Sequence, residues 1–293
     1  MNPVLVHQAE ELLNVATNPA ALRSSDALAA VRTTLAQNEE DLGLGFFIID
    51  RNGVSIGSAR DTNIGTRNLI AEQREELLDR IFSGESVFVP PIFSDVGIGD
   101  ASVNNTLSLF IAVPIRGANG DVIAALTKRL DPAEGFSRVL QFSRVGESGE
   151  SYAFDQTGIM VSASRFETDL REIDLLSEGQ SSIMNIQIRD PGGNMTEGFR
   201  SAASLDELPL TLMANRAISD GANNQGERSA TDGDMSGYRD YRGVPVYGAW
   251  LWDGEHGLGL TSEIDVAEAL ATFSTVRLTA IGVLSITLFL SLG

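Results

Sequence analysis

The sequence predicts an α+β protein, with a long N-terminal helix, two units built on antiparallel β-sheets, and a membrane helix at the C-terminal end. A hairpin over residues 46–59 is followed by a helix and three further strands. A second hairpin with the same Asp-x-x-Gly turn begins at Ser151, so the architecture repeats along the chain. The last segment, residues 276–292, is apolar almost throughout.

The composition sets the number of domains and excludes several classes of function. With 293 residues and 43% hydrophobic content, the chain is long enough for two domains. Its formal charge of -19 would repel a phosphate backbone, so we expect no nucleic-acid partner. The absence of cysteine excludes disulfides, thiol nucleophiles and cysteine metal sites, and the two histidines are too few for a histidine metal cage. We therefore expect neither a metal nor a cofactor.

The N-terminal segment carries apolar residues at helical spacing, among them Leu5, Ala9 and Leu12. Asn18-Pro19 should end this helix, because the residue before a proline is pushed out of the α conformation. A second helix is expected to begin near Ser25, a residue type that caps helices. The N-terminus lacks the basic region of a signal peptide, which leaves open whether a membrane anchor precedes it.

The first unit begins with short β runs and tight turns. Residues 46–49 and 54–59 are expected to form a hairpin around the turn at residues 50–53. Residues 66–82 have the spacing of a helix and are followed by Gly84, a residue type common just past helix ends. Strands are expected over residues 87–92, 107–115 and 122–130.

The second unit follows a linking helix expected over residues 132–141. Its hairpin is predicted over residues 151–154 and 159–164, with further strands over 182–188 and 198–201 and a final pair over 244–252 and 257–264. The acidic cluster Asp232-Gly233-Asp234 lacks the later glutamate of an EF-hand calcium loop. We therefore expect this cluster to be a solvated loop.

The apolar C-terminal segment reads VRLTAIGVLSITLFLSL over residues 276–292. A helix of this length spans roughly 26 Å, close to the ~30 Å hydrocarbon core of a bilayer. We interpret it as a membrane helix that the chain leaves unfinished; the alternative is a buried core helix.

Three segments carry a family resemblance: residues 146–166, which read GESGESYAFDQTGIMVSASRF, and residues 68–92 and 240–269. They resemble segments of double Cache sensor domains, PAS-like modules of bacterial transmembrane receptors. Together with the helices, they extend the resemblance over nearly the whole chain. The resemblance implies a PAS-like Cache fold for each unit, with a helical stalk over 1–41, a membrane-distal unit over 42–141, a membrane-proximal unit over 142–271 and a transmembrane helix over 272–293.

The same resemblance implies a function and a location. It points to the ligand-binding sensor region of a signalling receptor of chemoreceptor, histidine kinase, cyclase or Ser/Thr kinase type. Residues 1–271 would be extracytoplasmic, anchored in the bacterial inner membrane, and the expected partners are a small-molecule ligand and a second copy of the chain. The alternative is a membrane-tethered solute-capture or adhesion module without signalling output, which the sequence following Gly293 would distinguish.

Polar residues near the end of the first hairpin are the leading candidates for a distal ligand site. Arginine offers a planar fork for a carboxylate, and helix N-terminal amides favour anions, which suggests an anionic or zwitterionic metabolite. Residues 61–92 contain no tyrosine or tryptophan, unlike the amino-acid-sensing Cache subgroup, which argues against an ordinary amino-acid ligand. The candidates are Arg60, Asp61, Arg67 and Asn68, with Phe88, Pro90, Phe110 and Thr127 as an apolar wall; the alternative is a turn cap, solvated arginines and core packing.

A second group of candidates lies in the proximal unit, where most of the polar aromatic residues occur. Alternation along residues 247–252 places Trp250 and Trp252 on one face of a strand. That face either lines a cavity, where it could stack on a flat or cationic ligand, or packs as core. The candidates are Tyr152, Arg165, Tyr247 and Trp250, with the alternative that Arg165 holds a loop.

An enzymatic function finds little support in the sequence. Residues 146–150 lack the final glycine of a Gly-x-Ser-x-Gly nucleophile motif, and neither histidine stands in a pattern typical of a catalytic triad. We expect no catalytic residue in this chain. A degenerate hydrolase is the remaining alternative, which a panel of ester substrates would test.

Overall fold

The computed structural model describes residues 3–36, 44–94, 106–141, 144–223 and 231–271, together with 273, 279 and 281. These residues divide into two compact units, with the boundary between Phe136 and Ser137. No helix within the described ranges is long and apolar enough to cross a membrane. The membrane helix expected over 276–292 lies outside these ranges except for residues 279 and 281.

The N-terminal segment folds as three helices rather than one long helix, and the predicted break at Asn18-Pro19 and helix start near Ser25 are confirmed. They are α1 (Pro3–Asn14), α2 (Pro19–Arg23) and α3 (Asp26–Ala36). The Asn18 side chain accepts hydrogen bonds from the amides of Ala20 and Ala21, both at 3.1 Å, and so caps α2. Ser25 accepts from the amide of Ala27 in the same way. These two starts break the segment and let α3 pack beside α1.

The first unit contains a five-stranded antiparallel sheet in the order β2-β1-β5-β4-β3. Its strands are β1 (Phe46–Ile49), β2 (Ser55–Ser58), β3 (Val87–Ser94), β4 (Thr106–Arg116) and β5 (Val122–Leu130). The connection from β2 to β3 holds the 3₁₀ turn η1 (Asp61–Asn63) and the helices α5 (Leu69–Gln73) and α6 (Glu75–Ser83). The helix expected over 66–82 is therefore interrupted, at Arg74, where φ is -147°.

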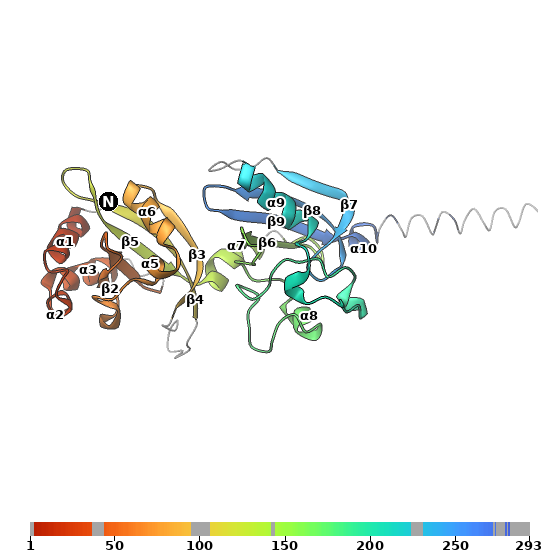
Figure 1. Ribbon diagram of the computed structural model, residues 1–293, viewed down its shortest axis with the longest axis horizontal. Coiled ribbons are helices and arrows are strands. Elements are labelled where there is room, and N and C mark those ends of the chain that lie inside the picture. Colours follow the sequence, from red (N-terminus) through yellow and green to blue (C-terminus); the bar gives the residue numbers. More distant parts are fainter. Residues whose placement is uncertain are drawn as a thin grey trace, which may run out of the picture. The chain divides into compact units, whose positions relative to one another are not determined.

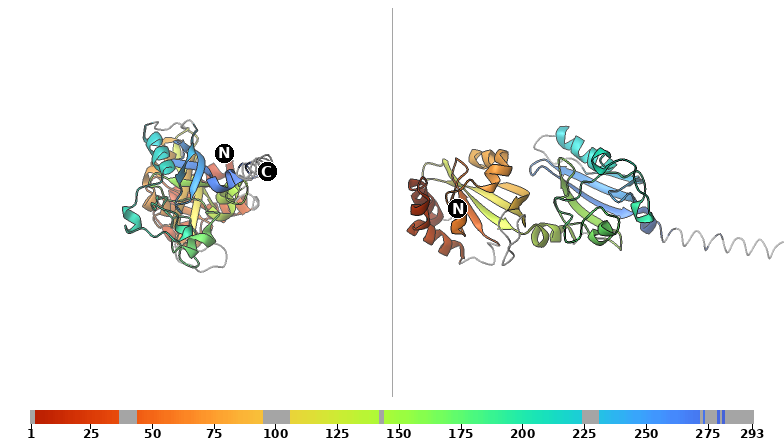
Figure 2. Two further views of the ribbon diagram at one scale, coloured as in Figure 1. Left: turned by 90° about the vertical axis from the view of Figure 1, so that its right-hand side faces the viewer. Right: turned by 60° about the horizontal axis from the view of Figure 1, so that its bottom comes forward.

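This sheet has a hydrophobic core on each face, because successive side chains of a strand point to opposite sides. Phe46 and Ile48 pack against α1 and α3, whereas Phe47 and Ile49 pack against α5 and α6. Figures 1 and 2 show the two helical layers on opposite sides of the strands. The FFII run is thus buried on both faces, which explains why it is continuously apolar.

A π-helical turn, η2 (Pro132–Ser137), crosses the boundary, and the second unit continues with α7 (Arg138–Gln141). Its four-stranded antiparallel sheet has the order β6-β9-β8-β7. The strands are β6 (Glu150–Asp155), β7 (Asp232–Arg239), β8 (Pro245–Asp253) and β9 (Leu258–Asp265), and the short helix α10 (Val266–Ala269) follows β9 directly.

The long connection from β6 to β7 holds α8 (Glu167–Glu172), the 3₁₀ turns η3 (Met195–Glu197) and η4 (Leu205–Glu207), and α9 (Leu212–Asn223). The core of the unit lies between this connection and one face of the sheet, and both Trp250 and Trp252 belong to it. Helix α9 approaches β8 so closely that a Cβ on Gly221 would lie 2.4 Å from the Trp252 ring. Figure 1 shows α9 lying along the β8 and β9 strands.

Three strand predictions in the second unit are wrong. Residues 159–164 and 182–188 form only isolated bridges, such as Ile159 with Gln187, and residues 198–201 form no strand. Conversely, the predicted loop at Asp232 is the edge strand β7, which pairs with β8. An edge strand needs hydrogen-bond partners on one side only, so its Asp, Gly and Ser residues are tolerated there despite low β propensity.

Candidate functional site

The first unit contains a cavity of about 430 Å³ between the β1–β2 hairpin, the η1 turn, α5 and the end of β3. Its wall is dominated by uncharged polar side chains, with Arg67 and Glu72 as its charged members. The lining residues are Phe47, Ser55, Thr62, Asn63, Thr66, Arg67, Asn68, Leu69, Glu72, Gln73, Phe93 and Ser94. Such a volume and lining suit a small polar molecule.

Arg67 is the basic residue of this wall; its guanidinium is accessible, and the two groups that it contacts line a neighbouring cavity of about 210 Å³. It donates to the Ala71 carbonyl at 3.2 Å and to the Glu75 carboxylate at 3.1 Å. The side chains of Arg67 and Glu75 are 47% and 72% exposed, and exposed pairs of this kind contribute little to stability. The guanidinium can therefore exchange Glu75 for a ligand carboxylate at small cost.

Asn68 and Gln73 form a rigid part of the wall. The Asn68 Oδ1 accepts from the Ile70 amide at 2.9 Å, which caps α5, while its Nδ2 donates to the Ser55 hydroxyl at 3.0 Å. The Gln73 amide group donates to the Phe93 carbonyl at 2.7 Å and accepts from the Phe93 amide at 3.2 Å. Both side chains are thus held by the protein, and they fix α5 against β2 and β3.

The other two hairpin-end candidates, Arg60 and Asp61, do not line this cavity. Asp61 lies on the side of the N-terminal helices, where it pairs with Arg32 at 2.7 Å. Arg60 lines a smaller neighbouring cavity of about 20 Å³, together with Phe110. The two cavities share Phe47, Asn63 and Ser94, none of which was predicted from the sequence as a site residue.

The four residues expected as an apolar wall lie in the sheet. Phe110 is fully buried in the core beneath α5 and α6, and its ring centroid lies 5.9 Å from that of Phe47. The Thr127 hydroxyl, also buried, accepts from the Phe47 amide at 3.1 Å. Phe88 packs on Phe136 at 5.4 Å, and Pro90 lies in the irregular stretch of β3. None of the four lines the larger cavity.

The proximal candidates form core and loop contacts in the second unit. Tyr152 and Trp250 are buried in the core, whereas Tyr247 is half-buried on the other face of β8. The Arg165 guanidinium donates to the carbonyls of Gly149 and Gly146, at 2.6 and 3.0 Å, and so holds the loop before β6. This unit has a cavity of about 220 Å³, which Tyr241 lines and these four residues do not.

A buried polar cluster, which the sequence analysis did not identify, lies beneath the second sheet. Glu263 accepts hydrogen bonds from the hydroxyls of Tyr152 and Tyr238, at 2.8 and 2.6 Å. Burial raises the pKa of the Glu263 carboxyl to about 8, and nearby Asp240 adds to the effect. Glu150, on the neighbouring strand, accepts from the Tyr241 hydroxyl at 2.7 Å.

Arg242 neutralises part of this cluster. Its side chain is 4% exposed and binds Asp240 at 2.7 Å and Asp265 at 2.9 Å. Its guanidinium also lies 3.6 Å from the centroid of the Phe166 ring, in a cation–π contact. Burial raises the pKa of Asp240 to about 6 despite the adjacent arginine.

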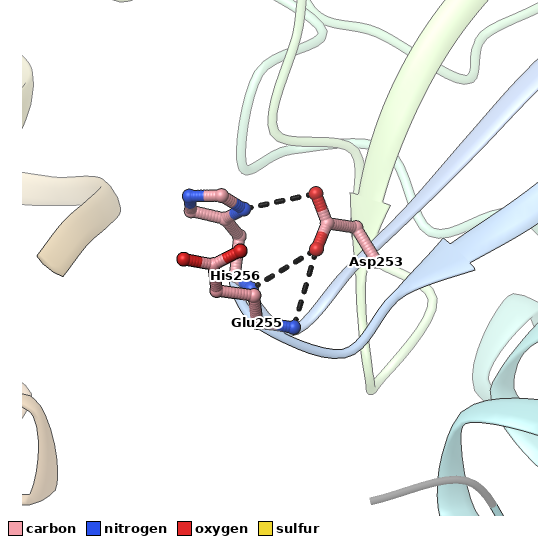
Figure 3. A group of neighbouring side chains, drawn as sticks. All are labelled: Asp253, Glu255 and His256. Atoms are coloured by element: carbon pink, nitrogen blue, oxygen red, sulfur yellow. Dashed lines mark hydrogen bonds and ion pairs between the residues drawn. The ribbon is translucent and has the colours of Figure 1, made fainter. Parts of the chain in front are cut away.

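The turn between β8 and β9 brings Asp253, Glu255 and His256 together (Figure 3). Their potential metal-ligand atoms lie within 4.8 Å of one another. Asp253 accepts from the amides of Glu255 and His256, at 3.2 and 3.4 Å, and lies 2.9 Å from Nδ1 of His256. These contacts account for the turn, and His256 thus has a carboxylate neighbour that its sequence pattern did not suggest.

Comparison with known proteins places the fold. No protein-family profile matches the chain, and no curated protein matches it in sequence. Among solved structures, the extracellular domain of a protein described as a histidine kinase, rpHK1S-Z16, is similar with a TM-score of 0.50 and 11% identity over 90% of both chains. This likeness confirms the fold that the sequence resemblance implied.

Two further structures are similar over most of their length. The sensor domain of the V. cholerae histidine kinase DctB has a TM-score of 0.45 and 14% identity, over 90% of this chain and 87% of its own. The ligand-binding domain of the Pseudomonas aeruginosa PAO1 amino-acid chemoreceptor PctB, solved with L-Arg, has a TM-score of 0.45 and 12% identity, over 97% and 95%.

Proposed function

We propose that this chain is the ligand-binding sensor region of a bacterial transmembrane signalling receptor. The observation that carries the proposal is the cavity of about 430 Å³ in the first unit, which has a polar wall and an accessible arginine. In this proposal, residues 42–141 form the membrane-distal unit and 142–271 the membrane-proximal unit of an extracytoplasmic, homodimeric domain. Residues 272–293 form the membrane helix, and the chain itself is not an enzyme.

The wall chemistry favours a small zwitterionic or anionic metabolite. Arg67 would bind a carboxylate, and Glu72, on the same wall, would face an ammonium group. Ser55, Thr66 and Ser94 offer hydroxyls for further hydrogen bonds. A zwitterion would match the balanced charge of the wall.

We expect a small carboxylate or zwitterion from a metabolite panel to raise the melting temperature of the full chain in detergent. Arg67→Ala should weaken the binding of that compound roughly 10- to 100-fold, because a charge-assisted hydrogen bond is lost. Thermal shift titration would measure the effect.

Two further variants locate the site. Arg80→Ala is the matched control, since Arg80 forms a comparable surface pair with Glu85 at 2.8 Å but does not line the cavity. Thr62→Trp should fill the cavity from an exposed lining position and abolish binding without removing a charge. If both Arg67→Ala and Thr62→Trp bind the compound as the unaltered chain does, the site is not in this cavity.

A further inference from the structure

Two buried carboxylates lie side by side on the same face of the second sheet, on neighbouring strands. Glu150 of β6 and Glu263 of β9 are direct partners in the antiparallel register, and they are 3% and 5% exposed. Side chains of directly opposed residues lie on the same face of a sheet with Cβ atoms about 5 Å apart, where like charges destabilise the pair. Two ionised carboxylates at this spacing, away from water, repel each other strongly.

The hydrogen bonds assign different roles to the two acids. Glu150 receives three donors: the Ser164 hydroxyl at 2.8 Å, the Arg165 amide at 2.6 Å and the Tyr241 hydroxyl at 2.7 Å. These contacts occupy both carboxylate oxygens of Glu150. Glu263 contacts only two tyrosine hydroxyls within the described structure. Because a hydroxyl can accept as well as donate, these two contacts persist when Glu263 carries a proton.

The surrounding charges do not compensate for a second ionised acid. Arg242, the buried guanidinium of this cluster, is occupied by Asp240 and Asp265, neither of which belongs to the pair. From β8, the residue opposite Glu263 is Gly248, which carries no charge. Arg165, whose amide binds Glu150, directs its guanidinium to the carbonyls of Gly146 and Gly149. The other titratable groups on the packed elements are Tyr152 of β6, Tyr238 of β7, Tyr241 of the β7–β8 turn, Arg216 of α9, which pairs with Asp234, and Glu268 of α10.

A continuous set of hydrogen bonds joins the acid pair to helix α10. The Arg165 amide binds Glu150, while its guanidinium holds the carbonyls of Gly146 and Gly149. Within this loop, the Glu147 amide, at 2.9 Å, and the Ser148 amide, at 2.7 Å, donate to the Glu268 carboxylate of α10. A displacement at Glu150 therefore reaches the helix from which the C-terminal segment continues.

We propose that the second unit is a proton sensor, in which the Glu150–Glu263 pair holds one proton and its release repositions the 146–149 loop and α10. Protons reach the pair through Tyr241, which binds Glu150 and lines the cavity of about 220 Å³. This input is separate from the ligand cavity of the first unit. It would allow one receptor to respond to both a metabolite and pH.

Infrared difference spectroscopy of the full chain in detergent tests the proton directly. At about pH 6.5, the spectrum of the unaltered chain minus that of the Glu263→Gln variant should show the carbonyl band of a protonated carboxylic acid. The band should disappear as the pH rises through about 8. In Glu150→Gln the band should titrate at lower pH, because the neighbouring negative charge is removed. Absence of the band in the unaltered chain at pH 6.5 would overturn the proposal.

Thermal unfolding gives a second measurement with a defined sign. The pKa of Glu263 in the folded state, about 8, lies above its ordinary value of 4.5, so the folded state binds more protons between these two values. Stability should therefore fall as the pH rises from 4.5 to 8, by roughly 3–5 °C per pH unit from this group, and level off above 8. Glu263→Gln should lack this contribution, whereas Glu178→Gln, at an exposed position, should keep it.

The coupling to α10 has its own test. Because the chain has no cysteine, a single spin label can be placed at the exposed position Ala267 by Ala267→Cys. The mobility of the label should change between about pH 6.5 and pH 9 in the otherwise unaltered chain and stay constant with Glu263→Gln. If the label responds equally in the chains with and without Glu263→Gln, the coupling is refuted. If it responds in neither chain, the acid pair binds a proton but does not move α10, and the sensor proposal is overturned.

Discussion

Replacing Arg242 with alanine is expected to lower the free energy of unfolding of the second unit by about 3–5 kcal/mol, as found when one partner of a buried ion pair is removed. The change would leave Asp240, which is 1% exposed, buried without its cation. It would also remove the second contact to Asp265 and the stacking on Phe166. Urea unfolding followed by tryptophan fluorescence would measure the loss, since both tryptophans lie in this unit.

Arg239→Ala is the matched control. Arg239 forms two hydrogen bonds to Asp190, at 2.8 and 2.9 Å, but its side chain is 45% exposed. Solvent screens this pair, so the expected loss is about 0–1 kcal/mol. Equal losses in the two variants would mean that burial does not decide the contribution of these arginines.

The pH dependence of the Arg242→Ala variant should identify the cause of its instability. In the folded chain the pKa of Asp240 is about 6 with Arg242 present, and loss of the arginine should raise it further. The variant should therefore recover part of its stability as the pH falls and Asp240 takes up a proton. Recovery would be absent if the loss came only from the packing of the arginine side chain.

The first unit could be predicted well because its elements have strong local signals. The Asp-x-x-Gly turn fixes the β1–β2 hairpin, and Asp50 Oδ1 does accept from the amides of Asn52 and Val54, at 3.0 and 2.8 Å. The three strands β3, β4 and β5 are long, apolar and bounded by turn residues. The breaks of the N-terminal helical segment, at Asn18-Pro19 and near Ser25, could also be predicted, because both carry residue types that end or cap helices.

The second unit was harder because tertiary contacts decide its structure. Residues 159–164 are as apolar as a strand, yet they form no regular ladder with β6. The Val161 amide donates to the Ala153 carbonyl of β6, and the Ala153 amide donates to the Ser162 hydroxyl rather than to a backbone carbonyl. Strand β7 has a sequence typical of a loop and is stabilised by pairing with β8. Local propensity carries little information about either segment.

The candidate site could be predicted only in part. Arg67 and Asn68 line the cavity, and their position at a hairpin end and helix start was the reason for choosing them. Thr62 and Gln73 were missed because a polar residue in a connecting segment gives no sign of which way it faces. The acids Glu150 and Glu263 were missed because a glutamate in an alternating strand normally occupies the exposed face. Only the pairing register shows that both face the core.

Trp250→Ala is expected to lower the free energy of unfolding of the second unit by about 3–5 kcal/mol, as for other buried aromatic side chains. Trp250 is 2% exposed, and its ring packs edge-on against Tyr238 with 5.9 Å between centroids. Removal would leave a cavity next to the Tyr238–Glu263 hydrogen bond. The same fluorescence and urea measurements apply, with Trp252 as the remaining tryptophan reporter.

Trp250→Phe separates this packing role from a role in ligand binding. Among the described residues, the indole Nε1 of Trp250 is a buried polar atom without a hydrogen-bond partner, which costs free energy in the folded state. Phenylalanine removes that atom and keeps much of the ring, so the expected loss is only about 1 kcal/mol. Ligand binding should be unchanged in this variant, because Trp250 lines neither cavity. Loss of metabolite binding in Trp250→Phe, with stability retained, would instead place the ligand in the second unit, against the aromatic face of β8.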